Sequence, residues 1–145
     1  MKDTEAAWLA GYIDGDGCIS IHNQTGREFR RLSLTIDSTD LCLLERVKDL
    51  TGTGTIVAKK KYKKHHSQAH SWRAGSAYRV IEILEAILPY LQCPSKIQRA
   101  KLVVDNWRKV TPKNGKYTDE MKAQKKEFEE KFLEIGNWRG YRNRT

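Results

Sequence analysis

Small residues and carboxylates share one short segment near the N-terminus of this chain. Ala7, Gly11 and Gly15 recur at every fourth position, so in a helix they would line one face. Asp14 and Asp16 then fall at the C-terminal end of that helix, where the helix dipole favours cations instead. Interior glycines cost about 1 kcal/mol each relative to alanine. Close helix–helix contact would compensate for the glycines, and a bound divalent cation would compensate for the acidic residues.

The end of this segment matches a known motif. Residues 9–17 read L-A-G-Y-I-D-G-D-G, which resembles the LAGLIDADG motif of homing endonucleases. The sequence differs from the motif at Tyr12 and Gly15, where the motif has Leu and Ala, and both replacements are common in that family. The resemblance implies that the motif helices of two domains pack face to face through their small residues. It also implies that the final acidic residue of each helix binds the catalytic metals.

The resemblance further implies which residues form the metal site and the subunit interface. Asp16 would be the metal ligand, with the backbone carbonyl of Gly15 beside it. Because the chain holds one copy of the motif, it resembles the single-motif members, which act as homodimers. The dimer interface would then be formed by Ala7, Gly11 and Gly15. We expect Mg²⁺, with Mn²⁺ as an alternative, because Mg²⁺ suits oxygen ligands in a site that keeps several waters and shares phosphate oxygens.

The sequence does not indicate other metal sites. A calcium loop needs the pattern D-x-[DN]-x-[DN]-G followed by a later Glu, whereas only Asp14 and Asp16 alternate here. His66 and His70 lie four residues apart, but in a predicted loop and strand without cysteine partners, which does not favour zinc. The three cysteines, at positions 18, 42 and 93, are scattered and are expected to be reduced thiols with no assigned chemistry.

The charge of the chain indicates a polyanionic partner. The chain has 145 residues, enough for one domain, with a net charge of +9 and an isoelectric point near 9.5. This balance favours nucleic acid over a small neutral substrate. No apolar run approaches the roughly 20 residues of a membrane span, and no secretory signal is visible. We expect a soluble intracellular protein, of the cytoplasm or an organelle, that binds double-stranded DNA and uses no membrane and no small-molecule cofactor.

Apolar periodicity and capping residues predict the order α-β-β-α-β-β-α followed by further helices. Helices are expected over about residues 4–14, 38–52 and 75–88, then from a capping box at Ser95–Gln98 and from Thr118; strands are expected over 18–24, 29–38, 55–61 and 68–74. This order is the core of the family that the motif resembles. We therefore predict an α+β LAGLIDADG homing endonuclease fold, whose αββαββα core carries a four-stranded antiparallel, saddle-shaped sheet and C-terminal helices. The endonuclease core is placed in residues 1–110, and residues 111–145 form a C-terminal helix and basic tail that pack on the core or extend it.

Strand alternation leaves one polar face on the predicted sheet. Leu32, Leu34 and Ile36 point to the core, for example, while their neighbours point away. The major groove of DNA admits a β-ribbon, and each base pair presents a distinct pattern of donors and acceptors there. The side chains predicted to face DNA are Ser20, His22, Gln24, Arg31, Ser33, Thr35, Asp37, Lys59, Lys61, Ser71 and Arg73.

Two further residues match positions around the active site of the family. Asp40 follows the second strand, where the family places a Gln or Asp that positions water, and its alternative role is that of an N-cap or first-turn acid. Lys96 falls where many members carry a basic residue, which would stabilise transition-state charge or polarise the attacking water. Its alternative role is that of a solvent-facing helix residue. Together with Asp16, these two residues form the predicted catalytic set.

The resemblance and the charge together predict a site-specific, double-strand DNA homing endonuclease that serves intron homing. It would cleave a long pseudo-palindromic target by divalent-metal-dependent phosphodiester hydrolysis, as a homodimer whose two-fold symmetry is mirrored in the target. The alternative is a non-cleaving nucleic-acid-binding protein on the same scaffold, either an intron maturase or a transcription regulator. Asp16 favours cleavage, because a pure binder has no need of a carboxylate that repels phosphate. The histidines do not fall in the pattern of an H-N-H nuclease.

Overall fold

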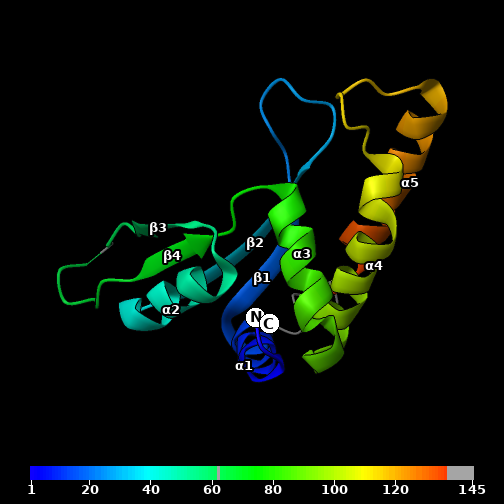
Figure 1. The fold of residues 1–145 in the computed structure, drawn as a ribbon. Helices are drawn as coiled ribbons and strands as arrows, with labels where there is room; N and C mark the ends of the chain where they lie inside the picture. Colours follow the sequence, from blue (N-terminus) through cyan, green and yellow to red (C-terminus); the bar gives the residue numbers. More distant parts are fainter. Residues whose placement is uncertain (62, 137–145) are drawn as a thin grey trace, which may run out of the picture.

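The computed structural model describes residues 1–61 and 63–136, so the predicted basic tail beyond residue 136 lies outside the described residues. The predicted αββαββα order and α+β class are confirmed, and two more helices follow (Figure 1). The elements are α1 (Asp3–Asp16), β1 (Gly17–His22), β2 (Arg31–Ser38), α2 (Leu41–Thr51), β3 (Thr55–Ala58), β4 (His70–Arg73), α3 (Ala77–Ile87), the short 3-10 helix η1 (Leu88–Tyr90), α4 (Pro94–Val110) and α5 (Asp119–Glu134). Within these described ranges, no helix is long and apolar enough to cross a membrane.

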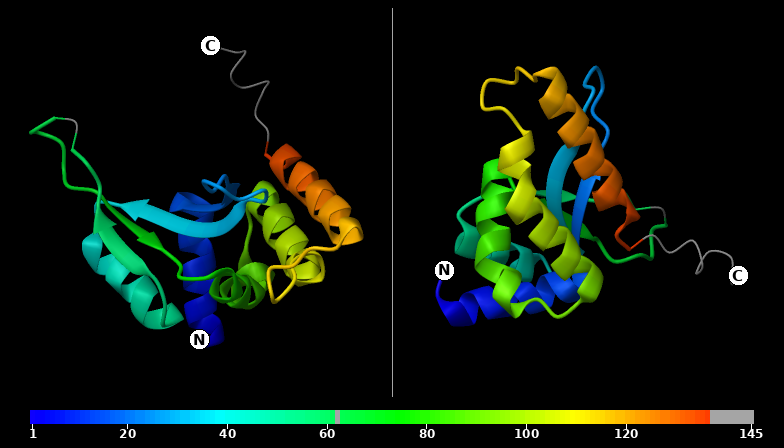
Figure 2. Two further views of the ribbon diagram at one scale, coloured as in Figure 1. Left: turned by 90° about the horizontal axis from the view of Figure 1, so that it is seen from above. Right: turned by 90° about the vertical axis from the view of Figure 1, so that its right-hand side faces the viewer.

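The four strands form one antiparallel sheet in the order β1-β2-β4-β3. All of β1 pairs with β2, from Gly17 opposite Ile36 to His22 opposite Arg31. The sheet is bowed, and α1, α2 and α3 lie on its convex side, while α4 and α5 stand beyond its β1 edge (Figure 2). The concave side is left without a helix across it, as the predicted one-sided sheet requires.

Alternate strand residues form the core under the sheet. Ile19, Leu34, Ile36 and Trp72 are all buried against the helices. The indole N–H of Trp72 donates to the carbonyl of Thr53 over 3.1 Å, so this large side chain is buried without an unsatisfied donor. Because successive strand residues point to opposite faces, burying these positions directs their neighbours to the concave face.

α1 extends beyond its predicted end at residue 14. The N–H of Gly17 donates to the carbonyl of Ile13, which continues the helix through Gly15 and Asp16. Gly17 itself permits the sharp exit into β1, because a Cβ at this position would lie 2.8 Å from the Cα of Ile13. The helix is therefore two residues longer than predicted at this end, and Asp16 is its last residue.

The capping box predicted at Ser95–Gln98 is also wrong. α4 begins earlier, at Pro94, with Cys93 in the N-cap position and no side-chain capping hydrogen bond. Proline suits the first turn because its fixed φ is already helical and its missing N–H would have had no helical partner. The local Ser-x-x-Gln pattern was therefore overridden by the proline that precedes it.

α5 packs on α4 around a buried lysine. Phe128 and Phe132 of α5 are buried together with Trp107 of α4. Lys125 is 1% exposed; its Nζ lies 3.3 Å from the centre of the Trp107 ring and donates to Oγ1 of Thr111 over 2.6 Å. Burial lowers the pKa of the Lys125 ammonium group to about 8, although a nearby glutamate acts in the opposite direction.

The lowered pKa of Lys125 predicts that the protein gains stability as the pH rises from about 8 to about 10.5. In this window the unfolded chain keeps the proton on Lys125 while the folded protein has released it, so the free energy of unfolding increases with pH. The gain is about 3 kcal/mol, from a shift of between two and three pKa units. Urea unfolding of the wild type and Lys125→Met at both ends of the window measures it. Equal pH dependence of the two proteins would contradict the prediction.

Candidate active site and nucleic-acid interface

The small-residue face of α1 is uncovered. Ala7, Gly11 and Gly15 are exposed, and a Cβ built on either glycine would meet nothing within 4 Å apart from the backbone of its own helix and its chain neighbours. The opposite face packs into the core as predicted, with Leu9 and Ile13 fully buried. α1 lies at the outside of the molecule, next to the N-terminus (Figure 1). Space for a second helix is therefore present along this face.

The two carboxylates at the end of α1 have different surroundings. Asp14 is partly buried, and both of its oxygens accept backbone hydrogen bonds: Oδ2 from the N–H of Gln92 over 2.9 Å and Oδ1 from the N–H of Cys93 over 3.0 Å. Asp16 is exposed, and its carboxylate forms no hydrogen bond or ion pair with the residues that the structure describes. The carboxylate of Asp14 thus forms hydrogen bonds within the fold, whereas the carboxylate of Asp16 is available to a ligand.

Lys96 reaches the same end of α1 from the first turn of α4. Its Nζ donates to the carbonyls of Ile13 and Asp14, over 2.7 Å in each case. These are carbonyls of the last turn of α1, where the helix dipole favours a cation. The structure therefore places Lys96 at the helix end that carries Asp16, without pairing their charges.

A metal ion at Asp16 would need ligands from outside a single chain. Within residues 1–61 and 63–136, no three His, Cys, Asp or Glu side chains group in a way that could hold a metal. The chain offers the exposed carboxylate of Asp16 and the carbonyl of Gly15, to which no described side chain donates. Both are oxygen ligands of the kind that Mg²⁺ prefers. They fit a divalent cation as one half of a site.

Asp40 occupies the N-cap position of α2 without capping the helix through its side chain. Its backbone N–H donates to Oγ of Ser38 over 3.0 Å, and the residue is exposed. In the described part of the chain, its carboxylate forms no hydrogen bond or ion pair with Asp16 or Lys96. Asp40 therefore occupies the N-cap position without the capping hydrogen bond that the alternative role requires, and its carboxylate stays free for other contacts.

Most of the predicted DNA-facing side chains share the concave face of the sheet. The strand register pairs Ser20 with Ser33, His22 with Arg31, Thr35 with Arg73, and Asp37 with Ser71. Residues paired across antiparallel strands point to the same side, so these eight lie on one face. Burial, together with the charges of Arg73 and Arg31, lowers the pKa of His22 and so favours its neutral imidazole, which can both donate and accept a hydrogen bond.

Three of the predicted positions lie outside the strands, and a fourth, Ser33, lies on the concave face but is buried. Ser33 is only 3% exposed, and its hydroxyl has no hydrogen-bond partner among the described residues. It is a short side chain on an inner strand, so longer neighbours shield it from solvent. Gln24 lies in the loop after β1, where its amide donates to the carbonyl of Phe29 over 3.4 Å. Lys59 and Lys61 follow the end of β3 instead of lying within it.

Asp37 introduces a negative charge on the otherwise basic concave face. Lys59 Nζ lies 2.7 Å from its Oδ2, and this hydrogen bond lowers the pKa of Asp37 against the opposing effect of partial burial. A hydrogen bond from Ser71 lowers it further. The carboxylate is therefore firmly ionised, with one oxygen already used by an exposed lysine.

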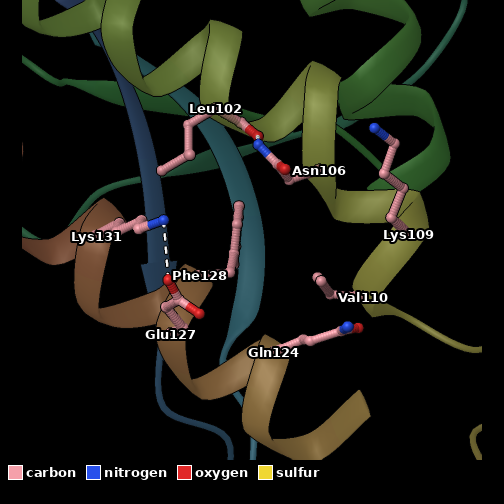
Figure 3. A pocket seen from close by; sticks show the side chains of 8 residues that line it. All are labelled: Leu102, Asn106, Lys109, Val110, Gln124, Glu127, Phe128 and Lys131. Atoms are coloured by element: carbon pink, nitrogen blue, oxygen red, sulfur yellow. Dashed lines mark hydrogen bonds and ion pairs between the residues drawn. The ribbon is translucent and has the colours of Figure 1, made fainter. Parts of the chain in front are cut away.

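Two pockets had no signal in the sequence. An open pocket of about 640 Å³ lies between the β1–β2 loop and the α4–α5 loop, and its basic lining residues are Arg27, Arg30, Arg31, Lys116, Lys122 and Lys125. The rings of Phe29 and Tyr117, 4.7 Å apart, hold these loops together. A smaller pocket of about 260 Å³ is lined only by α4 and α5 and carries the Glu127–Lys131 ion pair (Figure 3). Neither pocket contains Asp16, Asp40 or Lys96.

Comparison with known proteins agrees with this geometry. The sequence profile of the LAGLIDADG-like domain family matches residues 3–91. The chain belongs to this family. A curated relative, DNA endonuclease I-CvuI of Chlorella vulgaris, is 30% identical over 111 residues, which cover 72% of this chain and 64% of the relative. The chain therefore matches less than two-thirds of that relative's length.

Solved structures of the family share the fold. I-CvuI bound to an I-CreI target, with 2 mM Mg and DNA not cleaved, gives a TM-score of 0.71 at 26% identity, covering 93% of this chain and 84% of that one. I-CvuI with its own target in 2 mM Ca gives 0.68 at 22% identity, covering 93% and 83%. The archaeal intron-encoded I-Vdi141I complexed with DNA gives 0.64 at 12% identity, covering 95% and 87%. The LAGLIDADG homing endonuclease fold predicted from the sequence is thereby confirmed.

The ion pair on the concave face can be tested by titration. Lys59→Met should raise the pKa of Asp37 towards its ordinary value, because it removes the largest favourable contact of the carboxylate. NMR titration of the Asp37 side-chain carboxyl carbon measures the change. Lys101→Met, an exposed lysine on α4, serves as the control and should leave that pKa unchanged. An unchanged pKa in Lys59→Met would contradict the ion pair.

Proposed function

We propose that this chain is one subunit of a homodimeric, divalent-metal-dependent DNA endonuclease that cleaves a long pseudo-palindromic site, as a homing endonuclease does. One observation carries the proposal. The uncovered small-residue face of α1 ends at Asp16, whose carboxylate is exposed and unpaired. The next residue begins β1, the first strand of the sheet with the uncovered polar concave face. An interface, a reactive acid and a nucleic-acid surface therefore meet at one end of one helix.

The dimer would form through α1. With no Cβ at Gly11 and Gly15, two copies of the helix can approach closely along this face. Trp8, 39% exposed and in edge contact with Tyr12, adds apolar surface to the same helix. A two-fold axis along this contact brings two Asp16 carboxylates together, which completes the half-site that each chain offers.

The concave faces of two such sheets would bind two half-sites of DNA. Arg31 and Arg73 on this face can donate to guanine edges or to phosphates, and His22 and Ser71 can donate or accept. The net charge of +9 supports binding to the phosphate backbone, with the salt dependence that follows from counterion release. Because both sheets are identical, the preferred target is close to palindromic.

The proposed chemistry is hydrolysis of a phosphodiester bond in each strand. Asp16 and the Gly15 carbonyl of each subunit would hold Mg²⁺, or Mn²⁺ in its place, which when bound supplies an activated water and offsets phosphate charge. Asp40 would orient the attacking water through its free carboxylate. Lys96 would offset the charge that develops on the phosphate, because one of its three N–H bonds remains after the two contacts with α1.

A non-cleaving binder on the same scaffold, such as a maturase or a transcription regulator, is the competing function. It would need the concave face but not Asp16. An exposed carboxylate that no described cation neutralises would repel DNA phosphates, so its presence favours the nuclease.

The deciding experiment uses a duplex selected from a randomised library by its binding to the protein in Ca²⁺. Since I-CvuI left its bound DNA uncleaved at 2 mM Mg, cleavage is measured from below to well above that concentration. The wild type should cut both strands. Asp16→Asn should lower the rate by about 100-fold or more, because it removes the metal ligand while keeping the shape of the side chain.

Asp105→Asn is the matched control, since Asp105 is an exposed acid on α4. It should cut at the wild-type rate, and Mn²⁺ should support cutting by the wild type and by Asp105→Asn. If the wild type binds the duplex but never cuts it, the competing binder is favoured and the nuclease is refuted. If Asp16→Asn cuts normally, the metal assignment is wrong while the function stands.

The proposed interface is tested by Gly11→Leu. A Cβ at this position meets no atom within 4 Å beyond the local helix backbone, and the change removes a helix-weakening glycine, so the subunit should stay folded. It should block the helix–helix approach and give monomers in sedimentation velocity, where the wild type sediments as a dimer. Lys101→Leu on α4 is the control for an added surface leucine. A dimer of normal stability in Gly11→Leu would refute this interface.

A further inference from the structure

Four hydrogen bonds join the last turn of α1 to the start of α4 and the two residues that precede it. Asp14 accepts from the backbone N–H groups of Gln92 and Cys93, and Lys96 donates to the carbonyls of Ile13 and Asp14, at 2.7–3.0 Å. These two side chains and the four backbone groups form what we call the helix clamp. The two sides of the clamp lie about 80 residues apart in the sequence.

Neither helix end in the clamp has a favourable charge or a side-chain cap from its own helix. α1 has no basic residue in its last turn, and α4 has neither a side-chain capping bond nor an acidic residue in its first turn. Lys96 places its positive charge at the negative end of α1, and Asp14 places its negative charge at the positive end of α4. Each charge is therefore favourable only while the two helix ends stay together.

The clamp fixes the backbone on one side of Asp16. Both carboxylate oxygens of Asp14 are used, which restricts its orientation in two directions. On the other side of Asp16, Gly17 starts β1 opposite Ile36 and makes the tight exit from the helix. Asp16 and Gly15 therefore lie on a short stretch that is held at both ends.

We propose that Asp14 is a positioning residue for the metal site, acting through the helix clamp. It contacts neither metal nor DNA in this assignment; it holds the end of α1 so that the carboxylate of Asp16 and the carbonyl of Gly15 point into the shared site. The inference rests on the proposed nuclease function. It gives a role to the motif carboxylate that the catalytic set leaves out.

The test compares Asp14→Asn with Asp105→Asn, an exposed acid of α4 with no described partner. Hydrogen exchange reports the clamp directly: in Asp14→Asn the amides of Gln92 and Cys93 should exchange faster, because the asparagine keeps only one acceptor oxygen and no charge. This readout needs neither metal nor DNA. Asp14→Ala removes both acceptors and should increase exchange further if it folds.

The functional readout is the Mg²⁺ concentration at half-maximal cleavage of the selected duplex. Asp14→Asn should raise it by about 10-fold or more, the usual effect of losing a group that orients a metal ligand. Affinity for the same duplex in Ca²⁺ and sedimentation as a dimer should stay at wild-type values. A purely structural role of Asp14 would lower the melting temperature without moving the Mg²⁺ midpoint.

Three outcomes would overturn the inference or its basis, and they can be told apart. Unchanged exchange at Gln92 and Cys93 means that the clamp does not hold the helix end. If Asp14→Asn shows faster exchange but has the same Mg²⁺ midpoint as the control Asp105→Asn, the clamp exists but does not position the site. Failure of the wild type itself to cut refutes the nuclease function, whatever Asp14→Asn does.

Discussion

Burial of one face of α1 determines where the other features of this protein can lie. Leu9, Ala10 and Ile13 are fully buried against the sheet and the helices that cover it. Because helix positions four apart are nearly aligned, burial of these residues turns Gly11 and Gly15 outward and fixes which face is free. The same packing directs the end of α1 towards the start of β1, so Asp16 is carried to the edge of the concave face.

The order of elements could be predicted because its signals are local. Alternation in β2, the Ser76 hydroxyl that caps α3 and the left-handed Gly52 after α2 each act within a few residues. The motif in residues 9–17 added the family, and with it the prediction, which stays a prediction, that Asp16 and Lys96 belong to one active site. Periodicity also separated the buried from the free face of the sheet, since only one of the two had apolar residues at every second position.

The remaining features depend on contacts between distant segments. Nothing near Asp14 indicates that its carboxylate accepts from Cys93, and nothing near Lys125 indicates that Trp107 and Thr111 surround its amine. Ser33 has the pattern of an exposed position and is nevertheless covered by its neighbours. A residue's partner set and its degree of shielding follow from the packed fold, so neither periodicity nor a local motif specifies them.

The two motif carboxylates are treated differently, and this difference bears on assembly. Asp14 accepts hydrogen bonds from two backbone N–H groups just before α4, and Lys96 places its charge at the negative end of the α1 dipole. No described cation pairs with Asp16. A single exposed carboxylate is well solvated and costs little. Across the proposed two-fold interface, however, two of them would repel each other until a divalent cation lies between them. In such a dimer, metal binding and dimerisation would favour each other by the same free energy.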